Sequence, residues 1–208
     1  MINKLVALLE ESRRRGFLGP GPVEDHLDRA RAFSVVVDEP VRALDLGAGG
    51  GLPGMVLAEL CWPNTQWVFL DSQAKRTAFL IEAVEELGLE DRVQVVTARA
   101  EEMGQDPSHR GTYDLVTSRS FGPPAVVAEC ACPLLIEGGV LVVSEPPSAA
   151  VEERWPGGGL DLLGARSAEG VEVATEAGPV HFVKIFQREL SPVKYPRRVG
   201  IPTKRPLF

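Results

Sequence analysis

Cysteine and histidine are scarce in this chain of 208 residues. There are three of each; Cys61, Cys130 and Cys132 form no C-x-x-C pair, and the histidines do not cluster. An odd cysteine count without paired spacing argues against a disulfide framework, and the missing Cys/His groups argue against a zinc site. We therefore expect neither a disulfide nor a bound metal.

Long apolar runs are also missing. The longest, such as VVV at residues 35–37 and GGVLVV at residues 138–143, fall far short of the roughly 18 residues that a membrane-spanning helix needs. The N-terminal stretch MINKLVALLEESRRRG carries acidic residues and no cleavage-like site. We expect a cytoplasmic protein that does not enter membranes and that acts as a monomer.

The chain has no overall excess of positive charge, since its formal net charge is −7. As an average, this balance argues against a nucleic-acid partner. The distribution differs, because seven Lys and Arg residues from Lys184 onward face a single acid, Glu189. We predict that this basic end binds RNA, and the alternative is that its cations form only a solvated face. The candidate RNA-binding residues are Lys194, Arg197, Arg198, Lys204 and Arg205.

Apolar segments of strand and helix type alternate along the middle of the chain. We expect strands at 41–46, 66–71, 92–98, 113–119 and 138–144, with helices at 53–61, 74–87 and 123–135. Such alternation predicts parallel strands joined by right-handed crossovers, in a doubly wound α/β sheet. A loop-rich stretch then leads to an antiparallel terminal hairpin of 171–177 and 180–190 around a two-residue turn.

The ends of the chain differ from this middle part. Helical spacing predicts one helix over residues 1–15 and a second over 23–33. We therefore divide the chain into an N-terminal helical segment (1–40), a sheet domain (41–190) and a basic C-terminal tail (191–208).

One short stretch, ALDLGAGGGLPG at residues 43–54, is unusually rich in glycine. An apolar run that ends in glycines, with Pro53 following, is typical of a strand, a tight turn and the first turn of a helix. This geometry offers free backbone N–H groups and the positive end of a helix dipole to a ligand. Sites for NAD, FAD and S-adenosylmethionine share it, as do some purely structural turns.

Two carboxylates near this turn narrow the choice of ligand. Asp71 ends the second predicted strand, where a carboxylate accepts hydrogen bonds from ribose hydroxyls. Asp45 precedes the glycines, where its charge would repel a pyrophosphate and attract an ammonium group. The pair favours S-adenosylmethionine, and an NAD-linked or other small-molecule enzyme remains the alternative.

Several blocks carry a more specific resemblance. LDLGAGGGLPG, FLDSQAKRTAFL, ARAEE and YDLVTSRSF, over roughly residues 41–145, resemble the RsmG (GidB) family of small-subunit ribosomal RNA guanine-N7 methyltransferases. The tail KYPRRVGIPTKRPL is similar to the end of many members. The resemblance implies a class I S-adenosylmethionine-dependent methyltransferase fold, which is Rossmann-like. It also implies methyl transfer to guanine N7 in ribosomal RNA or a small-subunit precursor.

The resemblance further implies which residues hold the cofactor. Gly47, Gly49 and Leu52 would line the approach of methionine and adenosine, Asp71 would bind ribose, Ala100 and Glu101 would flank adenine, and Arg119 would border donor and target as the catalytic candidate. Gln73 and Arg99 are further candidates for the adenosine pocket. Without the resemblance, Glu101 reads as a helix-starting acid and Arg119 as half of a surface ion pair.

Attack by guanine N7 needs no general base, so the lack of a catalytic triad agrees with this chemistry.

Two regions depart from the family pattern. His26 and Asp28 match a His-x-x-Asp-Ser-like segment only loosely, and Ser144 and Glu145 stand where a lysine is common. These departures keep two alternatives open. One is a catalytically inactive or repurposed cofactor-binding relative; the other is a small-molecule methyltransferase in which residues 146–159 cover the pocket.

Overall fold

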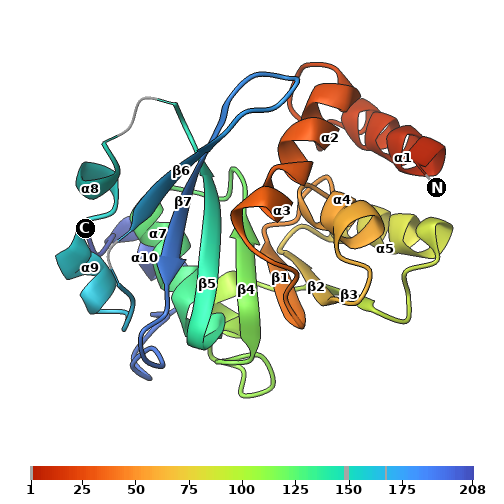
Figure 1. The fold of residues 1–208 in the computed structure, drawn as a ribbon. Helices are drawn as coiled ribbons and strands as arrows, with labels where there is room; N and C mark the ends of the chain where they lie inside the picture. The colour runs from red at the N-terminus through yellow and green to blue at the C-terminus, as the bar shows by residue number, and fades with distance from the viewer. Residues whose placement is uncertain (1, 148–149, 167) are drawn as a thin grey trace.

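The computed structural model describes residues 2–147, 150–166 and 168–208. A seven-stranded sheet with the order β3-β2-β1-β4-β5-β7-β6 forms its centre (Figure 1). The strands are β1 (Arg42–Leu46), β2 (Gln66–Asp71), β3 (Val93–Thr97), β4 (Tyr113–Ser118), β5 (Leu135–Glu145), β6 (Glu169–Val173) and β7 (Val180–Phe186). The first five strands pair in parallel, and β7 runs antiparallel to β5 and β6. The predicted doubly wound α/β sheet with an antiparallel terminal hairpin is confirmed.

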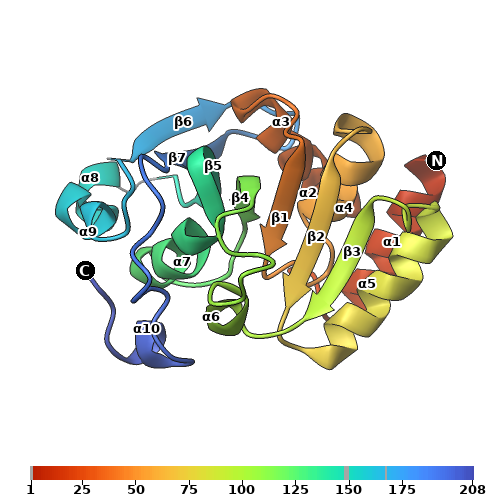
Figure 2. The ribbon, with the colours of Figure 1, turned by 90° about the horizontal axis from the view of Figure 1, so that it is seen from below.

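Helices cover both faces of this sheet (Figure 2). They are α1 (Ile2–Arg14), α2 (Val23–Arg31), α3 (Phe33–Val36), α4 (Gly54–Val56), α5 (Ala74–Leu87), α6 (Ala100–Met103), α7 (Pro124–Ala131), α8 (Val151–Arg154), α9 (Gly157–Asp161) and α10 (Ile201–Lys204). A π-helical turn (Leu57–Cys61) continues α4, and a 3₁₀ turn (Cys132–Leu134) follows α7. In the parts of the chain that the structure describes, no helix is both long and apolar enough to span a membrane.

The strands separate two apolar cores. On β2, Trp67 and Phe69 join a core that also contains residues of α1, α4 and α5, whereas Val68 and Leu70 join a core with residues of α7. Successive side chains of a strand point to opposite faces, so a strand covered on both sides is apolar throughout. Because both faces of the sheet are buried, a ligand can reach the sheet only at the ends of its strands.

The hairpin turn is longer than the sequence predicts. Residues 174–179 connect β6 to β7, where a two-residue turn was expected. This loop contacts α2, because Ala177 N donates to Asp28 Oδ2 (3.0 Å) and Arg29 Nη2 donates to Ala177 O (3.2 Å). Contacts with a helix almost 150 residues earlier in the chain hold the loop open, and a local pattern does not reveal them.

Two helices also end earlier than predicted. The segment expected at 23–33 divides at Ala32 into α2 and α3. The segment expected at 123–135 ends before Pro133, and Leu135 already begins β5. Proline has no N–H to donate and its ring clashes with the preceding turn, which explains the second boundary.

The C-terminal tail packs against the sheet domain. Arg110 donates to the carbonyl oxygens of Tyr195 and Ser191 (2.6 Å each), and Gln105 Nε2 donates to Pro196 O (2.6 Å). Tyr195 is buried in the same core as α7. These contacts bring the tail to the side of the sheet on which α6 and α7 lie (Figure 2).

Candidate functional site

Glycines clear space at the carboxyl end of β1. Gly47, Gly49 and Gly51 have φ angles of 73°, 55° and 96°, a region that side chains disfavour. A Cβ atom on Gly47 would lie 2.6 Å from Cδ2 of Phe121, so the Phe121 ring closes directly onto the backbone here. The backbone N–H groups of Gly47 and Ala48 donate to a carbonyl of β2, which fixes the turn against the sheet.

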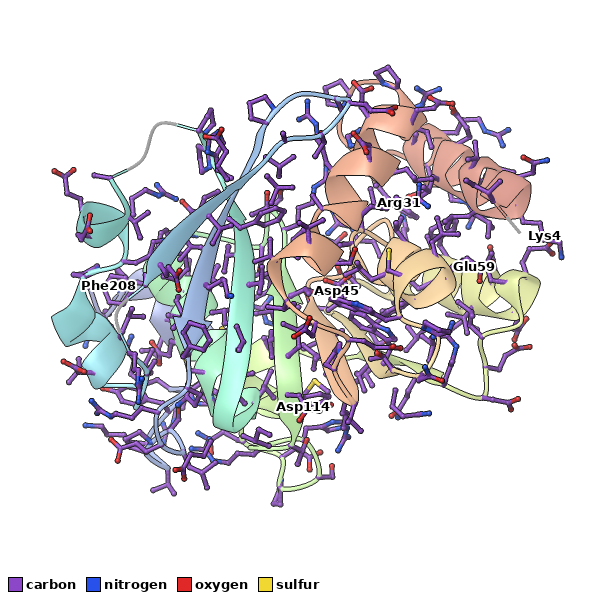
Figure 3. All side chains as sticks on the ribbon, viewed as in Figure 1. Lys4, Arg31, Asp45, Glu59, Asp114 and Phe208 are labelled. Carbon is purple, nitrogen blue, oxygen red and sulfur yellow. The ribbon has the colours of Figure 1, made fainter. Side chains whose placement is uncertain are left out.

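Asp45 lies in the interior beneath this turn (Figure 3) and is 1% exposed. Its Oδ2 accepts from Gly54 N (2.8 Å) and its Oδ1 accepts from Thr117 Oγ1 (3.0 Å). Burial raises the pKa of this carboxyl to about 7, although both hydrogen bonds oppose the shift. Both oxygens thus bind protein groups that join β1, α4 and β4. The expected contact of Asp45 with an ammonium group stays a prediction.

The strand order reverses at β1, which lies between β2 and β4. In open α/β sheets, ligands bind outside the carboxyl ends of the strands at such a point. A cleft of about 220 Å³ lies there. Among the predicted site residues, Gly47, Asp71, Ala100 and Glu101 line this cleft, as do Gln73 and Arg99.

Asp71 is buried at one wall of the cleft. Its Oδ2 accepts from Gly49 N (3.0 Å), and its Oδ1 accepts from Gln73 N (2.8 Å). Arg76 Nη1 lies 3.5 Å from Oδ2. A carboxylate offers about four acceptor positions, so Asp71 can accept further hydrogen bonds from a pair of hydroxyl groups in the cleft.

Glu101 connects the cleft to the C-terminal tail. Its Oε1 accepts from Gly200 N (2.9 Å) and lies 3.4 Å from Arg99 Nη2. Burial raises the pKa of this carboxyl, but the backbone N–H donors of Gly200 and of Glu101 itself, together with Arg99, outweigh burial and hold it below its usual range. Thr203 of the tail also lines the cleft, so the tail forms part of its wall.

A second hollow of about 200 Å³ lies on the other side of the glycine turn. It shares Gly47, Arg76 and Ser120 with the cleft, so the two spaces are neighbours around one turn. Three further predicted residues line this hollow, namely Gly49, Leu52 and Arg119. Asp45 lines neither space. Phe17, Leu18 and Gly19, from the segment between α1 and α2, complete its lining.

Arg119 follows β4 and is held by α2. Its Nη2 lies 2.9 Å from His26 Nδ1, and His26 Nε2 lies 3.2 Å from Gly19 O. Because a guanidinium only donates, His26 Nδ1 accepts and His26 Nε2 donates, which requires the neutral imidazole. Arg119 is therefore not half of a surface ion pair, and burial lowers the pKa of its guanidinium.

Two nitrogens beside the turn lack partners. Arg119 Nη1 and Arg76 Nε are buried and make no hydrogen bond with the described residues. A buried donor without a partner is unfavourable, so this pair is suited to a ligand that supplies acceptors, such as a carboxylate. Nowhere in the described ranges do three or more His, Cys, Asp or Glu side chains gather as metal ligands.

The basic tail divides into two groups of cations. Arg197 forms a paired contact with the fully buried Glu129, with Nη2 to Oε2 at 2.6 Å and Nε to Oε1 at 2.8 Å. This engagement departs from the expectation that Arg197 binds RNA. The other candidates, Lys194, Arg198, Lys204 and Arg205, are exposed.

Comparison with known proteins agrees with this geometry. The family model GidB, described as rRNA small subunit methyltransferase G, matches residues 23–152. A relative of that name from Synechococcus sp. (strain WH7803) is 35% identical over 188 residues, which cover 89% of this chain and 71% of the relative. The chain belongs to this rRNA methyltransferase family. A relative from Streptococcus pyogenes serotype M49 (strain NZ131), also 35% identical, covers 83% of this chain and 72% of its own length. The predicted family is confirmed.

Solved structures share the fold. Cofactor-bound Rv0187 from MTB superposes with a TM-score of 0.63 at 23% identity and covers 90% of both chains. The O-methyltransferase from Bacillus cereus in complex with SAH has a TM-score of 0.62 at 16% identity, over 89% of this chain and 90% of that one. The predicted methyltransferase fold is thus confirmed.

Some residues that line these spaces are missing from the prediction. Arg76, Ser120, Phe121 and Thr203 all line the cleft. The family-like blocks contain each of them, within FLDSQAKRTAFL, TSRSF or the tail, and this was the available signal. Ser120 has a φ of 57°, which is unusual for a residue with a side chain, and the sequence did not predict this conformation.

Proposed function

We propose that this protein transfers the methyl group of S-adenosylmethionine to N7 of a guanine in small-subunit ribosomal RNA. One observation carries the proposal: two adjoining spaces around the glycine turn offer different recognition chemistry. The acceptor Asp71 lines the cleft, and Arg119, whose buried Nη1 has no partner among the described residues, lines the second hollow. Together they suit a ligand with a nucleoside at one end and an amino-acid carboxylate at the other.

The cleft supplies the nucleoside end. Asp71 is suited to accept hydrogen bonds from both ribose hydroxyls, as acids at the end of the second strand commonly do in this class of sheet. Ala100 and Glu101 also line the cleft, where they would flank the adenine. Gly200 N already donates to Glu101, so the carboxylate is fixed in place before any ligand arrives.

The second hollow supplies the amino-acid end. Gly47 and Gly49 bring backbone close without side chains, and Arg119 and Arg76 offer the cationic donors that a carboxylate needs. His26 orients Arg119 through the 2.9 Å contact. Asp45 contributes indirectly, since its hydrogen bonds to Gly54 and Thr117 hold the turn in shape.

Methyl transfer to guanine N7 requires mainly that the protein position the base and the methyl donor. When bound, S-adenosylmethionine supplies an electrophilic methyl group on a sulfonium. Guanine N7 carries an exposed lone pair, so no side chain has to remove a proton. We assign the residues around Ser120 and Arg119 to bringing donor and base together, with Arg119 at the border of the two.

Ribosomal RNA is favoured as the substrate over a small molecule. No described residue of α8 or α9 lines the cleft or the second hollow, as a covering segment would. The exposed tail cations Lys194, Arg198, Lys204 and Arg205 lie close to Thr203 in sequence, and Thr203 lines the cleft. We propose that they contact the phosphates of RNA or of a small-subunit precursor in the cytoplasm, and we leave Arg197 out of this surface.

Calorimetric titration with S-adenosylmethionine and S-adenosylhomocysteine tests the cofactor assignment. We expect wild type to bind and Asp71→Asn to bind at least about tenfold more weakly, because charged hydrogen bonds to both hydroxyls are lost. Asp91→Asn, at an exposed position, is the matched control. Transfer of labelled methyl groups to unmethylated small-subunit RNA then separates an active enzyme from a relative that only binds the cofactor. Absence of cofactor binding in wild type contradicts the proposal.

A further inference from the structure

A third hollow, of about 370 Å³, opens beyond Arg119 at the carboxyl ends of β4 and β5. Its lining includes Arg29, Arg119, Ser120, Glu145, Pro147 and Pro179. The β6–β7 loop and α2 thus meet the ends of two parallel strands around one space. None of the roles described above uses this hollow.

Ser120 joins this hollow to the other two, since it lines all three. Arg119 also lines both the second and the third hollow. The positive φ of Ser120 turns the chain sharply at the end of β4, so one residue borders each space. A group bound in the third hollow is therefore next to a ligand bound in the cleft and the second hollow.

Glu145 is the one carboxylate in the lining of this hollow among the described residues. Its side chain is 7% exposed, and Arg154 Nε donates to its Oε2 (2.6 Å). The two cations of the lining, Arg29 and Arg119, come from α2 and from the loop after β4. Pro147, Pro179 and Val180 add apolar surface. A flat polar ring with donors on one edge and acceptors on the other would fit this set.

We propose that the third hollow holds the target guanine and that Glu145 recognises its Watson–Crick edge. This inference rests on the proposed function. Guanine carries two adjacent donors on that edge, N1–H and the 2-amino group, and the two oxygens of a carboxylate accept both. No other RNA base carries two adjacent donors on that edge, since adenine, cytosine and uracil each present a single donor beside one or two acceptors. N7 lies outside that edge, on the Hoogsteen edge next to O6, which leaves N7 free to face the donor and O6 free for an arginine.

The ion pair with Arg154 does not compete with this role. Each oxygen of a carboxylate accepts more than one hydrogen bond, so Oε2 can receive both Arg154 and a base. Arg154 does not line the hollow itself. It contacts the Glu145 carboxylate from outside the hollow, at the end of β5.

Nucleotide titrations monitored by NMR test the inference on protein saturated with S-adenosylhomocysteine. The probes are guanosine, inosine and adenosine 5′-monophosphates, because inosine keeps N1–H but lacks the 2-amino group. We expect the guanosine nucleotide to bind roughly tenfold more tightly than the inosine nucleotide, which is the discrimination typical of a bidentate contact. Glu145→Gln should remove this preference.

Two variants distinguish recognition from a structural effect. Arg154→Gln removes the ion pair but keeps the carboxylate, and Glu153→Gln changes a neighbouring exposed charge. Both should retain the preference for guanosine. Equal loss in Arg154→Gln and Glu145→Gln contradicts the inference, because the ion pair alone would then explain both.

Failure of the inference and failure of the proposed function give different results. A wild-type protein that methylates guanine N7 in ribosomal RNA, but for which the three nucleotides titrate alike or not at all, contradicts only the role of the third hollow. A wild-type protein that does not bind S-adenosylhomocysteine contradicts both.

Discussion

His26 Nδ1 lies 2.9 Å from Nη2 of Arg119, across 93 positions of sequence. This contact joins α2 to the loop that follows β4, at the border of the second and third hollows. The N-terminal helices therefore take part in the site, since one of their residues sets the orientation of the candidate catalytic arginine.

Replacing His26 tests this relationship. In His26→Leu, Arg119 loses its acceptor, and an unsatisfied buried donor costs about 1–3 kcal/mol. We expect binding of S-adenosylhomocysteine to weaken by roughly tenfold in calorimetry, since 1.4 kcal/mol corresponds to a factor of ten. His26→Gln keeps an acceptor oxygen and should recover most of the affinity. Wild-type affinity in the leucine variant would show that Arg119 needs no such support.

Asp45 predicts a pH dependence of stability. Its folded pKa of about 7 lies above the ordinary aspartate value of 3.8, so the folded state keeps a proton that the unfolded state has lost between these values. The free energy of unfolding therefore decreases as the pH rises from about 4 to about 7, by up to about 1.4 kcal/mol per pH unit for this group. Above that window its contribution no longer changes.

Denaturant unfolding of wild type and Asp45→Asn at several pH values measures this contribution. Other carboxylates titrate in both proteins, so the difference between the two curves isolates Asp45. We expect the stability of wild type relative to the variant to fall as the pH rises from 5 to about 7. A difference that stays constant with pH would mean that Asp45 is ionised throughout.

The buried pair of Arg197 and Glu129 predicts a stability effect. Glu129 is fully buried, so Arg197→Met leaves an uncompensated charge in the interior, which typically costs about 3–5 kcal/mol. We expect a large loss of unfolding free energy in chemical denaturation. The double variant Arg197→Met with Glu129→Leu should recover much of it, because no isolated charge remains. Unchanged stability in the single variant would contradict the structural role.

The exposed tail cations predict a different effect. Arg198→Gln, Lys204→Gln and Arg205→Gln should each weaken RNA binding and reduce the slope of log affinity against log salt by about one. Stability should remain unchanged, because these side chains are exposed. Lys4→Gln, on α1 and far from the C-terminus (Figure 3), is the control. If none of the three variants changes the slope of log affinity against log salt, the tail does not contact RNA.

The sequence predicted the sheet well because its signals are local. Apolar strands, glycine turns and helix periodicity lie within short segments, and Gly47 and Asp71 could be placed at the strand ends from their spacing. Roles that depend on distant partners could not be predicted in this way. Arg197 meets Glu129 across 68 positions, and Gly200 meets Glu101 across 99. Charge alone therefore placed Arg197 in a surface group, although its partly buried side chain pairs with the buried Glu129.

Asp45 gives a second example of the same limit. Its position beside the glycines could be predicted from the sequence, but its hydrogen bond to Thr117 depends on the pairing of β1 with β4. Only that pairing shows that the carboxylate binds the protein itself. The family-like blocks carried further information, since they contain Arg76, Ser120 and Phe121, yet only the structure shows that these residues line the cleft.

The most direct test of the account is to map the product of methyl transfer. Purified protein is incubated with methyl-labelled S-adenosylmethionine and unmethylated small-subunit ribosomal RNA, and the RNA is then cleaved chemically at 7-methylguanosine. The account predicts label at a single guanine, cleavage at that same position, and strong loss of both with Asp71→Asn. Label on another base or atom, or no label despite cofactor binding, would contradict it.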